Sequence, residues 1–228
     1  MRLQTYINES INDKGIFKAC FMAGNPGAGK SYVISKIKSG DIEPRIVNVD
    51  KLNEYLGADT QEQRESLYDK VHRITSNQLA NYINSMLPLW IDGTSAKVSE
   101  VSRRDKILRS VGYDTAMIWV NTTVETSIER AQKRKRKVSP EIITSMYNTI
   151  QGLKPKYKSM FSIFIEVNNN DGELNDAVIS RIYKKMLGFF SSPVKNKVGK
   201  EYISSGNKYL ADGDIDMSDI KNMTSGWF

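Results

Sequence analysis

Eight consecutive residues carry the clearest chemistry in the sequence: Gly24-Asn25-Pro26-Gly27-Ala28-Gly29-Lys30-Ser31. They fit the pattern G-x-x-x-x-G-K-[ST] without a mismatch. Glycines let a short loop turn its backbone N–H groups inward and approach a phosphate closely. In such a loop the lysine reaches the outer phosphates of a nucleoside triphosphate, and the following hydroxyl can bind Mg²⁺. We therefore expect a phosphate-binding loop (P-loop), with Lys30 on the β- and γ-phosphates and Ser31 on the metal.

Two acidic residues follow short apolar runs that are typical of β-strands. Asp50 comes directly after Arg45–Val49, and Asp92 after Leu89–Ile91. The carboxyl ends of parallel strands meet at the edge where α/β sheets bind ligands. There, Asp50 could accept the proton of an attacking hydroxyl, and Asp92 could organise Mg²⁺ or bond to Ser31. Structural roles stay open for both residues: Asp50 as the N-cap of a following helix, and Asp92 as a turn residue.

The segment 130–137 holds six cations in eight residues and no acid. Arg130 and Arg134 are four residues apart, so on a helix they would share one face. Placed over the P-loop, as part of a helical lid at about 124–150, they could neutralise charge on a transferring phosphoryl group. A solvated charged face or a nonspecific nucleic-acid patch is the alternative interpretation of the same segment.

The elements that must position these residues alternate along the chain. Strands are expected at 16–23, 45–49, 89–91, 116–120 and 161–167, and helices at 30–37, 61–87, 98–111, 124–137, 140–150 and 174–190. This alternation predicts a three-layer α/β fold of the P-loop NTPase type, with a central parallel five-stranded sheet and helices on both faces. The character of the sequence changes after 190. We expect a kinase-type domain over 1–190, a polar linker over 191–200, and a C-terminal tail that completes 191–228.

Composition excludes several classes of protein. The 228 residues carry 33 Lys+Arg against 26 Asp+Glu, a net charge of +7 that suits a polyanionic partner or simply a soluble surface. One cysteine excludes an internal disulfide framework, and one histidine, His72, leaves no histidine cluster for zinc. Cys20 is expected in the core and His72 in a structural or surface position. No apolar run approaches the ~18 residues of a membrane helix, so we expect a soluble cytoplasmic protein with no membrane partner.

The acidic tail invites one further interpretation. Asp212, Asp214 and Asp216 are spaced like calcium ligands, but Met217 stands where a calcium loop needs glycine. We expect no calcium site there. The tail aspartates could instead dock on the basic segment 130–137 of the same or a neighbouring subunit, which leaves a homo-oligomer open.

Together, the motifs of the sequence resemble those of a known family. The motifs Gly24–Ser31, Val47-Asn-Val-Asp50, Trp90-Ile-Asp92-Gly-Thr94 and Arg130-x-x-x-Arg134-x-x-x-Val-x-Pro140, continued to Ser-Met-Tyr147, look like the 5′-hydroxyl polynucleotide kinase domain of tailed phages. The same motif order is similar, more loosely, to zeta-toxin-type kinases that phosphorylate UDP-activated amino sugars. The resemblance covers roughly residues 16–190. It implies that Asp50 is the general base, that Arg134 contacts the phosphates in the transition state, and that the location is the host cytoplasm if the chain comes from a phage.

One residue departs from that resemblance. Polynucleotide kinases carry an arginine three residues after the base, and it holds a phosphate of the acceptor. This chain has Asn53 there, and a neutral amide offers no charge-assisted fork to a phosphate. The acceptor half of the site therefore matches less well than the phosphate-transfer half.

Three functions follow as hypotheses. The first is a Mg²⁺- and ATP-dependent kinase that phosphorylates a hydroxyl of a nucleic acid, either a 5′-hydroxyl or a hydroxyl on a modified base, or of a small nucleotide. The second keeps the mechanism and takes a UDP-sugar as acceptor. The third is an ATP-binding nucleic-acid module without transfer activity. The placement expected for Asp50 counts against the third, since binding alone needs no base.

Overall fold

A computed structural model of the chain describes residues 14–37, 42–134, 137–171 and 174–205. The strands are β1 (Lys18–Ala23), β2 (Arg45–Val47), β3 (Leu89–Ile91), β4 (Asp114–Asn121) and β5 (Phe164–Asn168). The helices are α1 (Lys30–Lys36), α2 (Val49–Tyr55), α3 (Gln61–Ser66), α4 (Tyr68–Asn84), α5 (Val98–Ser110), α6 (Val124–Gln132), α7 (Pro140–Met160), α8 (Asp176–Ser191) and α9 (Lys197–Ser204).

The five strands form one sheet in the order β2-β3-β1-β4-β5, and every neighbouring pair is parallel. This confirms the predicted α/β fold of the P-loop NTPase type. Strands β2 and β3 lie on one side of β1, and β4 and β5 lie on the other, so the order of the strands reverses at β1. In open parallel sheets such a switch point, at the carboxyl ends of the strands, is where ligands bind. The loop predicted to hold phosphate follows β1 at that point.

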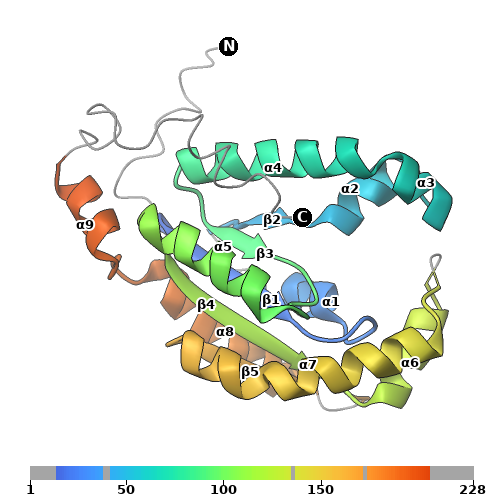
Figure 1. The fold of residues 1–228 in the computed structure, drawn as a ribbon. Helices are drawn as coiled ribbons and strands as arrows, with labels where there is room; N and C mark the ends of the chain where they lie inside the picture. The colour runs from blue at the N-terminus through green and yellow to red at the C-terminus, as the bar shows by residue number, and fades with distance from the viewer. Residues whose placement is uncertain (1–13, 38–41, 135–136, 172–173, 206–228) are drawn as a thin grey trace, which may run out of the picture.

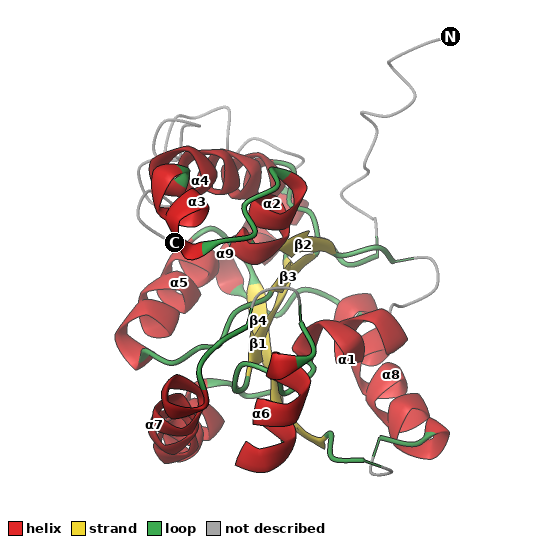
Figure 2. Ribbon diagram, turned by 90° about the vertical axis from the view of Figure 1, so that its right-hand side faces the viewer, coloured by secondary structure: helices red, strands yellow, loops and turns green. Residues whose placement is uncertain are grey.

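Side chains of β1 alternate between two separate apolar cores, one on each face of the sheet. Phe21 points to the core that α4, α5 and α7 complete, and Met22 to the core that α1 and α8 complete. Figure 2 shows these two groups of helices on opposite sides of the strands. Cys20 is fully buried in the second core, as predicted, and this burial raises the pKa of its thiol well above the usual value.

Three of the predicted helices differ in the structure, and the one over 124–137 ends early, at Gln132. The helix expected over 61–87 is broken at Leu67, which is the C-cap of α3 and the N-cap of α4. The helix expected to end near Ile150 continues to Met160 even though Pro155 lies inside it. Its last turns are held by Tyr157, which is fully buried and donates a hydrogen bond from its hydroxyl to the carbonyl of Ser95 at 2.6 Å.

The C-terminal part of the described chain folds back on the sheet. Where the sequence predicts a polar linker over 191–200, the structure has the start of α9, which buries Gly199 and Tyr202. Gly199 packs so closely on Gly112 that a Cβ on it would meet the carbonyl oxygen of Gly112 at 2.4 Å. The tail aspartates and the calcium-like spacing lie outside the described residues.

Candidate active site

The P-loop depends on glycines at positions where a side chain would not fit, Gly27 and Gly29 among them. Gly27 and Gly29 have φ values of 87° and 85°. A Cβ on Gly27 would meet the carbonyl oxygen of Ser127 at 2.1 Å, and one on Gly29 would meet Nδ2 of Asn169 at 2.2 Å. The loop is thus packed between α6 and the residues that follow β5. Asn169 also donates from Nδ2 to the carbonyl of Ala28 at 2.7 Å, which fixes the loop from outside.

Lys30 bonds back to the loop itself. Its Nζ donates to the carbonyl oxygens of Gly24 at 2.8 Å and Asn25 at 3.1 Å. Burial lowers the pKa of Lys30 to about 8, with the charge of Arg134 acting in the same direction and those of Asp92 and Asp50 opposing it. A cation that has lost much of its water and holds only neutral carbonyls is well placed to bind phosphate.

Three strand ends meet beside Lys30, and their polar side chains are bonded together. Ser31 donates from Oγ to Oδ2 of Asp92 at 3.1 Å, as the sequence predicts for these two residues. Asn48 donates from Nδ2 to the same oxygen at 2.6 Å. The Asp92 side chain is 9% exposed. Hydroxyl and carboxylate oxygens are the ligands that Mg²⁺ takes from proteins together with substrate phosphates, so the pair fits that ion.

Asp50 does not close a strand and does not cap a helix, so both sequence interpretations of its position are corrected. Strand β2 ends at Val47, and Asn48 is the N-cap of α2, accepting at Oδ1 from the backbone N–H of Lys51 at 3.1 Å. Asp50 therefore lies in the first turn of α2. Its side chain is 66% exposed and its Oδ1 accepts from Nη1 of Arg64 at 2.6 Å.

Arg64 is placed there by the short helix α3. None of the six residues of α3 is buried, and Arg64 is the one among them that is not exposed. Its Nε donates to the carbonyl of Ala58 at 3.0 Å, which folds the guanidinium back towards Asp50. Asn53, in contrast, is 6% exposed and donates to the carbonyl of Val49, so its amide is turned inward.

Arg130 and Arg134 do not share a helical face, which corrects the prediction of one helix over 124–137. Helix α6 ends at Gln132, whose Nε2 donates to the carbonyl of Val138 at 2.6 Å. Arg130 stays within α6, while Arg134 lies beyond its end. Of the remaining basic residues, Lys135 and Arg136 are outside the described residues.

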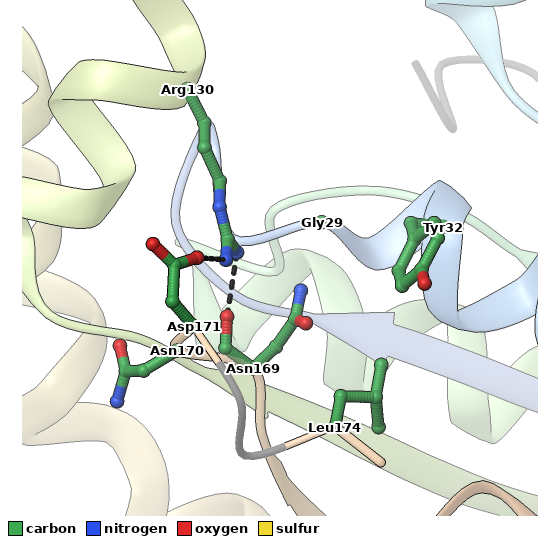
Figure 3. A pocket seen from close by; sticks show the side chains of 7 residues that line it. All are labelled: Gly29, Tyr32, Arg130, Asn169, Asn170, Asp171 and Leu174. Atoms are coloured by element: carbon green, nitrogen blue, oxygen red, sulfur yellow. Dashed lines mark hydrogen bonds and ion pairs between the residues drawn. The ribbon is translucent and has the colours of Figure 1, made fainter. Parts of the chain in front are cut away.

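Arg130 borders a cavity of about 350 Å³ beside the P-loop. Its guanidinium donates to the carbonyl of Asn169 at 2.6 Å and to Oδ1 of Asp171 at 2.8 Å, as Figure 3 shows. Tyr32 reaches the same cavity from α1, and Leu174 lines it from the segment before α8. An arginine, an aromatic ring and an aliphatic side chain around one cavity suit a planar heterocycle.

Sequence reasoning missed several of these residues. Asn48 and Arg64 each contact an acid that it selected, and Tyr32 and Asn169 line the cavity. A signal existed for Asn48, since asparagine is a preferred N-cap residue directly before a helix. The run Asn168-Asn169-Asn170-Asp171 after the fifth strand also marks the ligand edge of the sheet. Nothing local marks Arg64, which meets Asp50 across 14 positions of the chain.

One family of known proteins matches a large part of the chain. The model of a family described as AAA domain (AAA_33) matches residues 20–152, which is more than half of the chain. The chain belongs to this AAA domain family. The match runs from β1 through the P-loop, both acids and Arg134 into α7.

Solved structures with a similar fold are distant in sequence. A candidate kinase from Chloroflexus aurantiacus is 13% identical, with a TM-score of 0.54 over 76% of this chain and 98% of that one. The APS kinase CysC of Mycobacterium tuberculosis, solved with AMPPNP and APS, is 15% identical, with a TM-score of 0.45 over 78% and 99%. A structure from the PezAT toxin-antitoxin system of Streptococcus pneumoniae is 18% identical, with a TM-score of 0.48 over 92% of each chain. The first of these supports the P-loop NTPase fold of the AAA domain described here.

The described residues contain neither a cluster of metal-binding side chains nor a helix that could span a membrane. Within them, no group of three or more histidine, cysteine, aspartate or glutamate side chains could hold a metal ion. None of the helices in the same part of the chain is long and apolar enough to span a membrane.

Proposed function

We propose that this AAA domain protein is a Mg²⁺-dependent kinase that transfers the γ-phosphoryl group of ATP to a hydroxyl group. The observation that carries the proposal is the set of charges around Lys30. The charges of Asp92, Arg134 and Asp50 all shift the pKa of Lys30, and Ser31, the residue after it, bonds to Asp92 at 3.1 Å. The metal-site acid, one arginine of the basic segment and the candidate base therefore all act on one phosphate-binding lysine. A nucleotide-binding module needs the metal-site acid, but only phosphoryl transfer needs the acid, the arginine and the base together.

Each group has a separate task in the transfer. The backbone of the P-loop and Lys30 bind the β- and γ-phosphates, and Ser31 with Asp92 would hold Mg²⁺, which supplies positive charge to the phosphate oxygens when bound. The oxygen of the acceptor hydroxyl bonds to the γ-phosphorus, and Asp50 accepts the proton that this hydroxyl loses. The bond from that phosphorus to the β-phosphate oxygen breaks, and ADP leaves. Arg134 balances the charge that develops on the transferring group.

The two arginines of the basic segment serve different parts of the nucleotide in this proposal. Arg130 is held by Asn169 and Asp171 at the cavity, which Gly29 and Tyr32 also line. This cavity is where we place the adenine base. Arg134, which acts on the charge of Lys30, belongs to the phosphates. The catalytic role predicted for Arg130 therefore becomes nucleotide binding.

For the acceptor we propose a hydroxyl of a nucleic acid. The supports are the net charge of +7, the spacing of Arg130, Arg134 and Pro140, and the exposed carboxylate of Asp50. An acceptor that is itself a polyanion gains from a basic protein through release of its counterions. Arg64, beside Asp50, gives this side of the site the cation that Asn53 does not provide.

The test is transfer of ³²P from γ-labelled ATP to a panel of acceptors. The panel holds 5′-hydroxyl DNA and RNA, DNA with hydroxymethyluracil, and UDP-sugars. We expect label on a nucleic acid, dependent on Mg²⁺. Label on a UDP-sugar alone would replace the acceptor and keep the mechanism. Bound ATP with no label on any acceptor would contradict the kinase proposal and favour a binding module.

A matched pair of variants ties the label to Asp50. Asp50→Asn should lower transfer by about 10²–10⁴-fold, the usual value of a general base. Asp69→Asn is the control, since Asp69 is likewise an acid in the first turn of a helix, α4. Full activity of Asp50→Asn would remove the assignment of the base.

A further inference from the structure

The side chain of Asn48 makes two bonds that lead to different halves of the site. Its Oδ1 accepts from the backbone N–H of Lys51 at 3.1 Å, which caps α2. Its Nδ2 donates to Oδ2 of Asp92 at 2.6 Å. One end of this amide thus holds the helix that carries the candidate base, and the other end holds the candidate metal-site acid.

The order of strands explains how one residue reaches both. Asn48 follows β2, Asp92 follows β3, and the P-loop with Ser31 follows β1. These three strands are neighbours in the order β2-β3-β1, so the side chains form a row along the carboxyl edge. The backbone adds to the row, because the N–H of Asp92 donates to the carbonyl of Val47 at 3.0 Å.

Both donors on Asp92 use the same oxygen. Ser31 Oγ and Asn48 Nδ2 bond to Oδ2, at 3.1 Å and 2.6 Å, and neither bond uses Oδ1. Two donors on one oxygen fix the rotation of a carboxylate, so the direction in which the other oxygen points is fixed as well. Partners of a metal ligand that orient it in this way commonly change metal affinity by 10–100-fold when they are removed.

We propose that Asn48 is a positioning residue that orients Asp92 towards Mg²⁺ and, through the cap of α2, holds Asp50 in register with it. The inference rests on the proposed function, because it concerns the metal and base of that same site. Two hydrogen bonds join the Asn48 side chain to the backbone of α2 and to Asp92. Its amide is what makes the two bonds compatible, since a carboxylate could cap α2 but could not donate to Asp92.

The experiment separates the cap from the bond to Asp92. In Asn48→Ser the shorter side chain can still cap a helix but cannot span to Asp92. The readout is the fluorescence of N-methylanthraniloyl-ATP, titrated with MgCl₂ on the full chain. We expect the Mg²⁺ concentration at half-saturation to rise about tenfold. Affinity for the same nucleotide in EDTA should stay within about twofold, because no phosphate contact has changed.

Asn196 supplies a matched control at the other end of the strands. It caps α9 through Oδ1, and its Nδ2 donates to the carbonyls of Arg109 and Tyr113. Asn196→Ser therefore keeps a cap and loses bonds to distant partners, as Asn48→Ser does. We expect it to lower the melting temperature by a few degrees without moving the Mg²⁺ half-saturation.

The outcomes are distinct. A wild-type Mg²⁺ half-saturation in Asn48→Ser, or an equal shift in Asn196→Ser, overturns the inference. If Asn48→Ser does not fold, Asn48→Thr, another capping residue without the reach, takes its place in the same titration. A wild-type protein that binds Mg²⁺ with the nucleotide but labels no acceptor overturns the proposed kinase, and the titration still decides the role of Asn48. A wild-type protein whose nucleotide binding ignores Mg²⁺ overturns the inference itself.

Discussion

The two ends of the β-sheet are both held by polar side chains, but they use them differently. At the amino end, Lys18 is 1% exposed and donates from Nζ to Oδ2 of Asp114 at 2.7 Å, to Ser192 and to the carbonyl of Pro193. Asp114 also accepts from the backbone N–H groups of Lys195 and Asn196. This cluster ties the segment before α9 to the sheet, and its charges are balanced within the protein.

At the carboxyl end Asp50 and Asp171 are paired with Arg64 and Arg130, but the hydrogen bonds of Lys30 go to neutral groups. Lys30 holds two neutral carbonyls and has a pKa of about 8, while Asp50 is 66% exposed. Figure 1 shows α9 at one end of the strands and α3 and α6 at the other. A lysine of the sheet can therefore serve stability, as fully buried Lys18 does with Asp114 beside it, or ligand binding, as partly buried Lys30 does with neutral carbonyls beside it. A lysine with its anion is a structural tie; a lysine without one is a site for phosphate.

Replacing Lys30 by methionine is expected to have the largest effect. Transfer should fall on the order of 10³-fold, because the cation is lost where charge develops on the phosphoryl group. Stability should stay the same or rise, since the lowered pKa means that the folded protein disfavours the charged form of Lys30. Kinetics with the best acceptor of the panel measures the first effect, and urea unfolding the second. A variant that loses stability and keeps transfer would reverse our assignment of the two ends.

Replacing Lys18 by methionine should do the opposite. Removing one partner of a buried ion pair costs about 3–5 kcal/mol, because Asp114 keeps a charge that only two backbone N–H groups then bind. Nucleotide affinity of the folded protein should not change. Lys97→Met is the control, since Lys97 pairs with Glu100 at the surface and such pairs contribute under about 1 kcal/mol. Urea unfolding of both variants checks the contrast, and equal losses would contradict it.

The same two ends differ in how far sequence could predict them. The P-loop and the contact of Ser31 with Asp92 were predictable, because a local motif and the parallel order of strands determine them. The exact place of Asp50 was not, since Val47-Asn48-Val49 looks like strand until the cap made by Asn48 is known. Helix α9 depends on Gly199 meeting Gly112, a contact across 87 positions that no local pattern encodes.

Arg134 and Arg130 should separate within the carboxyl end. Arg134→Ala is expected to lower kcat about 10²-fold with little change in KM for ATP, since its charge acts beside Lys30. Arg130→Ala should raise KM for ATP about tenfold and leave kcat nearly unchanged, because its guanidinium lines the cavity and is held by Asn169. Steady-state kinetics of both variants provides the measurement. A fall of kcat in Arg130→Ala equal to that in Arg134→Ala would restore the predicted lid of two equivalent arginines.

The smallest expected effect is a dependence of nucleotide affinity on pH. Lys30 has a pKa of about 8, so it is charged below that pH and becomes neutral above it. Bound phosphates favour the charged form and raise this pKa, so above pH 8 binding must take up a proton. We expect the Kd for N-methylanthraniloyl-ATP to be flat between pH 6.8 and 7.5 and to rise by up to about tenfold from pH 8 to 9. Lys30→Met should bind more weakly and lose this dependence. Lys18→Met should keep it, because Lys18 of the wild type is paired with Asp114 at the other end of the sheet. A wild-type Kd that stays constant to pH 9.5 would mean that Lys30 remains charged, and that the carbonyls around it stabilise the cation as well as a built-in anion does.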